Sequence, residues 1–239
     1  MNEIKDARKN VKRTFIFIVI IAIFTIGVLY IMNYYNLIPK EYFKASDFSI
    51  KTVYSKMDYD KDRIDDYTDF VLGARHDAEK HPTYISKYYD NSYPPENEGV
   101  CTDVIWRAFK NAGYSLRDMV DEDIKNNPND YPNIEYRDKN IDFRRVGNLK
   151  IFFSKYSISL TLDYTEISEF QPGDIVIFDD SHIGIISDRR NSKGIPYVIH
   201  NYGQPIREED FIGKSKLTAH FRFDASKIDE NILKPWRNQ

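Results

Sequence analysis

Residues 99–113 read GVCTDVIWRAFKNAG, and this stretch decides how the rest of the chain can fold. Apolar side chains recur at positions i, i+3, i+4, i+7, i+8 and i+11, which are Cys101, Val104, Ile105, Ala108, Phe109 and Ala112. The spacing predicts an amphipathic helix with one face packed on a core. Gly113 follows the last apolar residue, where a left-handed glycine commonly ends a helix.

Cys101 opens this helix and is the only cysteine among 239 residues. Free backbone N–H groups and the helix dipole stabilise a thiolate or an oxyanion at a helix start. The preceding residues 94–99 (PPENEG) form an irregular loop that leaves the sulfur accessible. The position therefore favours a nucleophile. A small buried hydrophobe and a thiol that pairs with another chain are the alternatives.

Short β-rich runs dominate the last third of the chain. Strands are predicted at Asp174–Phe178, His182–Ser187, Pro196–His200 and Leu217–Phe223, because β-branched and aromatic residues alternate with turn sequences there. Together with the helix of Cys101, they predict an α+β fold in which that helix packs on a small antiparallel sheet.

A cysteine nucleophile needs a base, and the base needs an orienting group. His182 begins one predicted strand and His200 ends the next, so antiparallel pairing brings both to one end of the sheet. We predict His182 as the base and His200 as the orienting residue, with Asn201 as an alternative orienting residue. A zinc site built from Cys101 and the two histidines competes with this interpretation, although no second cysteine supports it.

Residues 14–32 read TFIFIVIIAIFTIGVLYIM and contain no charge. At about 1.5 Å per residue, such a helix spans a hydrocarbon core of roughly 30 Å. We predict a transmembrane helix at 14–33 and a basic cytoplasmic tail at 1–13, which places the remaining chain outside the membrane. A cleaved signal peptide is the alternative, but the run is long and lacks an A-x-A-like site.

The outer part of the chain divides by composition into a stalk, a domain and a tail. The stalk is predicted at 34–57, the catalytic domain at 58–225 and the tail at 226–239. The whole chain has a net charge of −3, and its first thirteen residues are basic, so the remainder is acidic. An acidic domain without a basic stripe argues against nucleic acid as a partner.

An acidic loop precedes the first predicted helix of the domain. Residues 58–69 (DYDKDRIDDYTD) carry carboxylates at positions 1, 3, 5, 9 and 12, which is similar to a calcium loop. The candidate ligands are Asp58, Asp60, Asp62 and Asp69. Arg63 stands where such loops carry glycine, and its charge opposes a cation. An acidic helix N-terminus is the alternative, and no other cofactor is expected.

Four segments together resemble the NlpC-type cell-wall peptidases of the papain-like superfamily: Cys101 at a helix start, QPGDIVIF at 171–178, HIGI at 182–185 and VIH at 198–200. A closer resemblance, over residues 60–225, is to a bacterial family named domain of unknown function 1287. The segments that carry it are YPP at 93–95, GVCTDV at 99–104, WR at 106–107, NIDFRRV at 140–146 and IHN at 199–201.

The resemblance implies a papain-like core and hydrolysis of amide bonds in peptidoglycan stem peptides, with peptidoglycan or muropeptides as partners. Two features depart from the common pattern: Thr102 replaces a frequent serine, and residues 114–150 form an insertion with short helices. The predicted substrate-binding residues are Tyr93, Asp103, Arg144, Arg145 and Asn201. The two arginines suit a substrate carboxylate, and a structural salt bridge is their alternative role.

Two other functions use the same residues. One is a catalytically inactive protein that binds the cell wall, and the other is an acyltransferase of the same fold. Thiol reactivity and product analysis distinguish these functions from hydrolysis.

Overall fold

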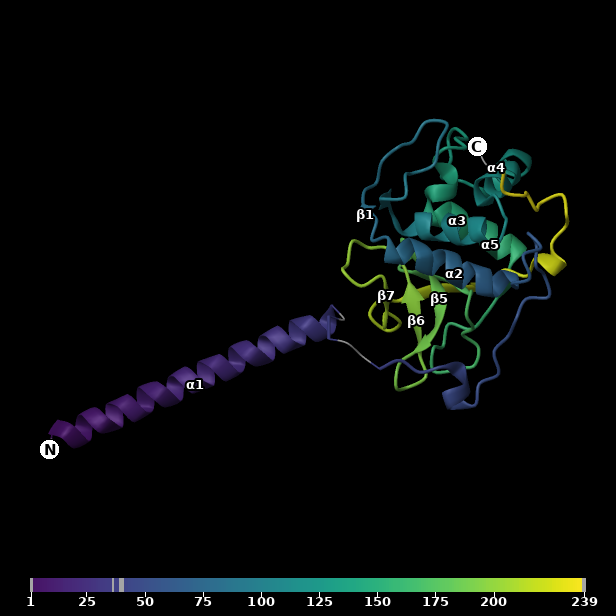
Figure 1. The fold of residues 1–239 in the computed structure, drawn as a ribbon. Coiled ribbons are helices and arrows are strands. Elements are labelled where there is room, and N and C mark those ends of the chain that lie inside the picture. Colours follow the sequence, from purple (N-terminus) through teal and green to yellow (C-terminus); the bar gives the residue numbers. More distant parts are fainter. Residues whose placement is uncertain (1, 36, 39–40, 238–239) are drawn as a thin grey trace. The chain divides into compact units, whose positions relative to one another are not determined.

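The computed structural model describes residues 2–35, 37–38 and 41–237. The chain divides into two compact units, Met1–Lys40 and Glu41–Gln239 (Figure 1). The first unit is dominated by one helix, α1 (Asn2–Tyr34), and the second unit contains the sheet and the remaining helices.

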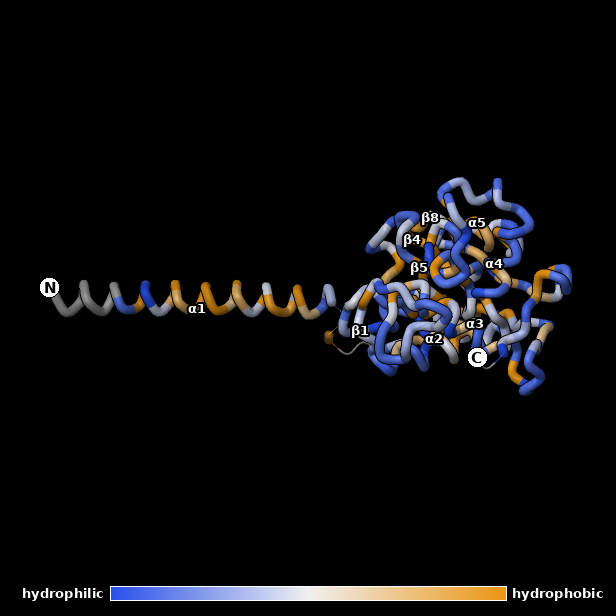
Figure 2. The backbone as a smooth tube through the Cα atoms, turned by 90° about the horizontal axis from the view of Figure 1, so that it is seen from above, coloured by the Kyte–Doolittle hydropathy of each residue, from blue (hydrophilic) through white to orange (hydrophobic). Residues whose placement is uncertain are grey.

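Helix α1 is long and apolar enough to cross a membrane over Asn10–Tyr34. Hydrophobic residues cover most of this stretch in Figure 2, and their side chains are exposed to solvent rather than packed on other residues. The predicted span at 14–33 lies inside this helix. Its length and composition are those of a single membrane-spanning helix.

A six-stranded sheet forms the centre of the second unit, in the order β3-β8-β4-β5-β6-β7. Every neighbouring pair of strands is antiparallel. The strands are β3 (Ile158–Ser159), β4 (Ile175–Phe178), β5 (His182–Arg190), β6 (Pro196–Ile199), β7 (Glu208–Glu209) and β8 (Leu217–Arg222). The four predicted strands are confirmed, and so is the mixed α+β class.

Helices α2 (Asp66–Glu79) and α3 (Cys101–Asn111) pack against each other, and both contact β5. Helix α3 begins at Cys101 and ends before Gly113, whose φ of 82° is the left-handed conformation expected there. The predicted insertion at 114–150 contains α4 (Leu116–Asn126), η2 (Pro128–Asp130), η3 (Asp142–Arg144) and the first turn of α5 (Val146–Tyr156).

Both faces of the sheet are buried. Along β4, Ile175 and Ile177 pack into the larger core with α2 and α3, whereas Val176 and Phe178 belong to a second, smaller core. This alternation reflects the period of two in a β-strand. The unbroken apolar run in β4 is thus explained by a strand that is buried on both faces of the sheet.

The domain is longer at both ends than the predicted range of 58–225. Part of the predicted stalk belongs to it, because Phe43 pairs with Arg190 and the N–H of Val53 donates to Oε1 of Gln171 at 3.0 Å. Part of the predicted tail belongs to it as well, because Trp236 stacks on Trp106 with ring centroids 6.0 Å apart. These segments lack a helical or strand period, so their packing left no pattern in the sequence.

The loop before α3 contains a small parallel sheet of β1 (Thr83–Tyr84) and β2 (Glu98–Gly99). Two short 3₁₀ helices, η1 (Ala45–Phe48) and η4 (Ala225–Lys227), lie in the end segments. The β1–β2 pair matters for the site because β2 leads directly into Cys101.

Candidate active site

The two predicted histidines meet at one end of the sheet. A tight turn with left-handed residues at Asp179 and Asp180 connects β4 to β5 and places His182 opposite Phe178. His200 directly follows β6, which pairs with β5 through Ile199 and Ile185. Nε2 of His182 consequently lies 2.8 Å from Nδ1 of His200, which is a hydrogen bond between the rings.

Gly184 makes room for this pair. A Cβ atom at this position would lie 2.6 Å from Cγ1 of Val198 and 3.1 Å from Cβ of His200. Any larger residue would therefore push β6 or the His200 ring away. The glycine in HIGI has a steric role next to the histidines.

Glu209 extends the pair and was not predicted from the sequence. Strand β7 pairs Glu209 with Val198, which brings its Oε1 to 3.3 Å from Nε2 of His200. Nζ of Lys214 lies 2.9 Å from the other carboxylate oxygen. His182, His200 and Glu209 thus form a buried line of polar groups.

The protonation states of these groups follow from their surroundings. Burial lowers the pKa of His200 and, together with the charge of His200, lowers the pKa of His182 to about 3. Burial alone would raise the pKa of Glu209, but the hydrogen bond and charge of His200 and the contact with Lys214 lower it. At neutral pH the two rings are neutral and Glu209 is a carboxylate.

These states fix both tautomers. The carboxylate of Glu209 accepts, so Nε2 of His200 carries its proton and Nδ1 accepts from Nε2 of His182. Nδ1 of His182 then carries a lone pair. Within the described residues this buried atom has no hydrogen-bond partner, as expected of a base that awaits a proton.

Cys101 lies beside the start of β5. The backbone N–H groups of Ile183 and Thr102 act on its thiol and lower the pKa, and Ile183 directly follows His182. The residue is only 5% exposed, and burial raises the pKa of its thiol to about 11 despite those N–H groups. The expectations of an accessible sulfur and a stabilised resting thiolate are thereby corrected, because desolvation outweighs the helix start.

Asp103 and Arg144 hold the beginning of α3. Nε and Nη2 of Arg144 donate to the two carboxylate oxygens of Asp103 at 2.8 and 2.9 Å. Asp103 also accepts from the N–H of Val100 at 2.7 Å and from Nε1 of Trp106 at 2.8 Å. Both charged groups are buried and paired with protein atoms, so we assign Arg144 the structural role that was its alternative, and Asp103, predicted only as substrate-binding, has the same role.

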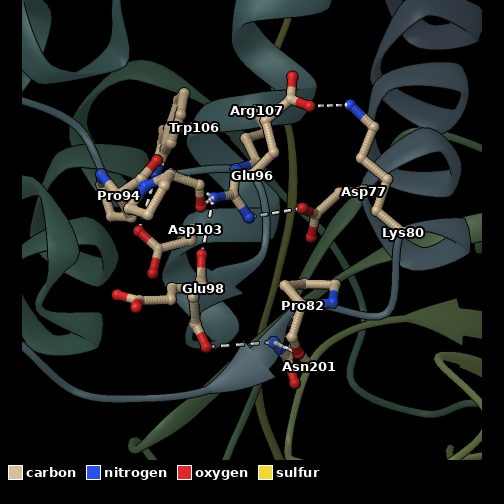
Figure 3. A network of polar contacts seen from close by, with 12 residues as sticks. Asp77, Lys80, Pro82, Pro94, Glu96, Glu98, Asp103, Trp106, Arg107 and Asn201 are labelled. Carbon is tan, nitrogen blue, oxygen red and sulfur yellow. Dashed lines mark hydrogen bonds and ion pairs between the residues drawn. The ribbon is translucent and has the colours of Figure 1, made fainter.

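A second network ties the loop before α3 to its surroundings (Figure 3). Arg107 pairs with Asp77 at 2.5 Å and donates to the carbonyls of Pro95 and Glu98, both at 2.8 Å. Asn201 donates to the carbonyl of Gly99 at 3.2 Å. Asn201 therefore joins the end of β6 to the residues before Cys101, and its amide contacts neither histidine.

Two exposed tyrosines, Tyr84 and Tyr202, lie near His182. The ring of Tyr202 packs edge-on against His182 with centroids 5.0 Å apart, and Tyr84 lies 6.1 Å from Tyr202. Cys101 is among the groups whose charge acts on Tyr84, so this side chain is near the thiol. The two rings offer a ligand an apolar surface next to His182.

The remaining predicted substrate-binding residues lie elsewhere. Tyr93 lines a cleft of about 640 Å³ with Trp106 and Trp236, and Cys101 does not line that cleft. Arg145 is exposed, and its Nε lies 4.0 Å from Asp142. The structure thus gathers Cys101, His182 and His200 but separates them from Tyr93 and Arg145.

A zinc ion does not suit the two histidines. The nitrogens that face each other are joined by a hydrogen bond, and the outer nitrogen of His200 is paired with Glu209. Over the described part of the chain, the acidic loop holds the only group of three residues whose carboxylate, imidazole or thiol atoms lie within 4.8 Å of one another. The competing metal interpretation of Cys101 is not supported.

The site defines an α+β protein with a Cys-His-His-Glu line at one end of an antiparallel sheet. The chain belongs to the family described as "Domain of unknown function (DUF1287)", whose model matches residues 71–223. It is similar to the uncharacterized protein YijF of Escherichia coli (strain K12), with 36% identity over 149 residues, which are 59% of this chain and 72% of that protein. No solved structure matches the chain.

Proposed function

We propose that this chain is a membrane-anchored cysteine hydrolase with an NlpC-like, papain-like catalytic arrangement. It cleaves amide bonds in peptidoglycan stem peptides on the outer side of the membrane. The observation that carries the proposal is Nδ1 of His182, which has no hydrogen-bond partner among the described residues while His200 and Glu209 line up behind its ring. The next residue, Ile183, has a backbone N–H that acts on the Cys101 thiol.

The proposed reaction begins from a neutral thiol and a neutral imidazole. The raised pKa of Cys101 and the lowered pKa of His182 disfavour a resting ion pair. Nδ1 of His182 takes the thiol proton as the sulfur attacks the substrate carbonyl, which is general-base catalysis. The negative charge passes to the carbonyl oxygen of the tetrahedral intermediate, and the free backbone N–H groups at the start of α3 are the donors available to stabilise it.

The imidazolium then acts as the acid. His182 donates the same proton to the leaving amine, and the acyl group remains on the sulfur as a thioester. Water attacks the thioester, with His182 again as the base. Throughout the cycle, His200 and Glu209 hold the ring orientation and stabilise the positive charge, as the third member of a triad does.

The membrane location is part of the proposal. Helix α1 supplies the apolar length, and the basic residues at 1–13 favour a cytoplasmic N-terminus by the positive-inside rule. The catalytic domain then faces the cell wall, where stem peptides are found. Protease treatment of intact cells would degrade the domain if this orientation is right.

The experiment is product analysis by mass spectrometry. Purified peptidoglycan is incubated with the detergent-solubilised chain, with Cys101→Ala, and with His76→Gln as a control at an exposed histidine outside the site. We expect new amino termini in the stem peptides with the wild type and the control, but none with Cys101→Ala. Equal cleavage by Cys101→Ala would contradict the proposal.

The burial of Cys101 favours one rival, a wall-binding protein that does not cleave. Such a protein would retain peptidoglycan on a pull-down while the wild type and Cys101→Ala both release no amine. Retention together with catalytic release by the wild type alone would exclude this rival.

A further inference from the structure

We propose that residues 58–69 bind a calcium ion through four carboxylates, those of Asp58, Asp60, Asp62 and Asp69. The site lies outside the Cys-His-His-Glu line and does not depend on the proposed hydrolase function. Ligand oxygens of Asp58, Asp60 and Asp62 lie within 4.8 Å of one another. Oxygens bound to one calcium ion at about 2.3–2.6 Å have separations of this size.

Asp69 is the observation that turns an acidic cluster into a candidate site. The residue is 1% exposed, and its Oδ2 is buried without a hydrogen-bond partner among the described residues. Its Oδ1 accepts from Nδ2 of Asn111 at 2.9 Å, so the carboxylate is held in place. A buried carboxylate oxygen with no partner is costly, and a bound cation would satisfy it.

Asp69 lies one turn of α2 after Asp66, whose Oδ1 accepts from the N–H of Tyr59 in the loop at 3.0 Å. Asp60 packs against Gly113, because a Cβ atom added to Gly113 would lie only 2.6 Å from the Cβ of Asp60. Asn111, two residues before Gly113, binds Asp69. The three loop carboxylates form one region of concentrated negative charge beside Asp69, which a divalent cation would relieve.

The loop backbone already has the curvature that a calcium loop requires. The carboxylate of Asp58 accepts from the N–H groups of Asp62 at 3.1 Å and Arg63 at 2.9 Å, which turns the chain around it. Arg63 occupies the usual glycine position with a φ of 83°. Its side chain is exposed, so the arginine is compatible with the loop at some cost in strain and charge.

The chemistry favours calcium over magnesium. Calcium accepts six to eight oxygens in irregular geometry, and four carboxylates with the Ile64 carbonyl at position 7 and water reach that number. Magnesium requires a smaller, near-octahedral shell. A calcium ion would join the loop to α2 through Asp69, next to the end of α3, and would thereby stabilise the domain.

Binding is tested with the full-length chain in detergent, stripped with EGTA. Tyr59 lies inside the loop, so it should sensitise terbium luminescence, and CaCl₂ should displace terbium with a Kd of about 10⁻⁴–10⁻³ M. We expect 10 mM CaCl₂ to raise Tm by roughly 4–7 °C, and MgCl₂ to raise it much less.

Three variants make the test specific. Asp62→Asn keeps an oxygen for the N–H of Ile64, so the loop should fold, yet calcium affinity should fall at least about tenfold. Glu79→Gln, at the exposed far end of α2, is the matched control and should retain the shift. Arg63→Gly removes the opposing charge and the strain, and should tighten binding by about tenfold.

The outcomes separate clearly. A calcium-dependent Tm shift that Asp62→Asn loses and Glu79→Gln keeps supports the site. The absence of terbium luminescence in the wild type, or equal shifts in Asp62→Asn and Glu79→Gln, would overturn it.

Discussion

Nε2 of His182, which begins β5, lies 2.8 Å from Nδ1 of His200, which directly follows β6. The contact sets the tautomer of His182 only because Glu209 sets the tautomer of His200 from the other side. The catalytic proposal therefore depends on a line of three buried residues rather than on one histidine, and each member can be tested separately.

Glu209→Gln should lower kcat by roughly 10²–10³-fold with little change in KM, because a neutral amide neither fixes the tautomer nor stabilises the imidazolium. The matched control is Asp210→Asn, which keeps an acceptor oxygen for Asn191. Steady-state kinetics with purified peptidoglycan checks the difference. A Glu209→Gln enzyme as fast as the control would remove Glu209 from the mechanism.

Gly184→Ala should destabilise the chain by about 1–3 kcal/mol and reduce activity, because its Cβ would collide with Val198 and crowd His200. At Gly147 in α5, an added Cβ meets nothing within 4 Å. Gly147→Ala should therefore be neutral or more stable by up to about 1 kcal/mol. Urea unfolding of both variants gives the comparison, and similar stabilities would contradict the close approach at Gly184.

The sequence predicted the strands, the helix of Cys101 and the pairing of the two histidines, because each of these features has a local pattern. The apolar period gives the helix, and the hairpin pattern places His182 and His200 at one end of the sheet. Glu209 has no such signal, because only the register of the two-residue strand β7 distinguishes it from Glu208. Its position depends on tertiary pairing.

The burial of Cys101 could not be predicted for a related reason. Helix position indicates which N–H groups surround the sulfur, but its desolvation depends on β5 and on Asn201, which binds the carbonyl of Gly99, and both are distant from Cys101 in the sequence. Arg144 is similar, since its partner Asp103 is 41 residues away. Whether a buried charged residue binds a ligand or forms a structural ion pair depends on its partner, and sequence spacing does not reveal that partner.

Stability should fall as the pH drops from about 6.5 towards 3. The folded chain keeps His182 neutral, with its pKa lowered to about 3, whereas the unfolded chain takes up a proton below about pH 6.5. Between pH 7 and pH 5 this linkage removes about 2 kcal/mol. His182→Gln should lose correspondingly less over this range in urea unfolding, and parallel losses in the two proteins would contradict the lowered pKa.

Arg144→Lys should cost about 3 kcal/mol, because lysine cannot replace the two parallel hydrogen bonds to buried Asp103. Arg145→Lys is the neighbouring control, and it should change stability by less than about 0.5 kcal/mol because this side chain is exposed. Thermal unfolding measures both. Equal effects would show that the Asp103–Arg144 pair does not hold the start of α3.

The central claim is that the sulfur of Cys101 forms the covalent intermediate, and intact-mass spectrometry of acid-quenched reactions tests it most directly. The chain is mixed with stem peptides from purified peptidoglycan and quenched within the first turnover. The account predicts an added acyl mass that peptide mapping locates on Cys101 and that is absent in Cys101→Ala. Stem-peptide cleavage by Cys101→Ala at the wild-type rate, with no adduct on the wild type, would contradict it.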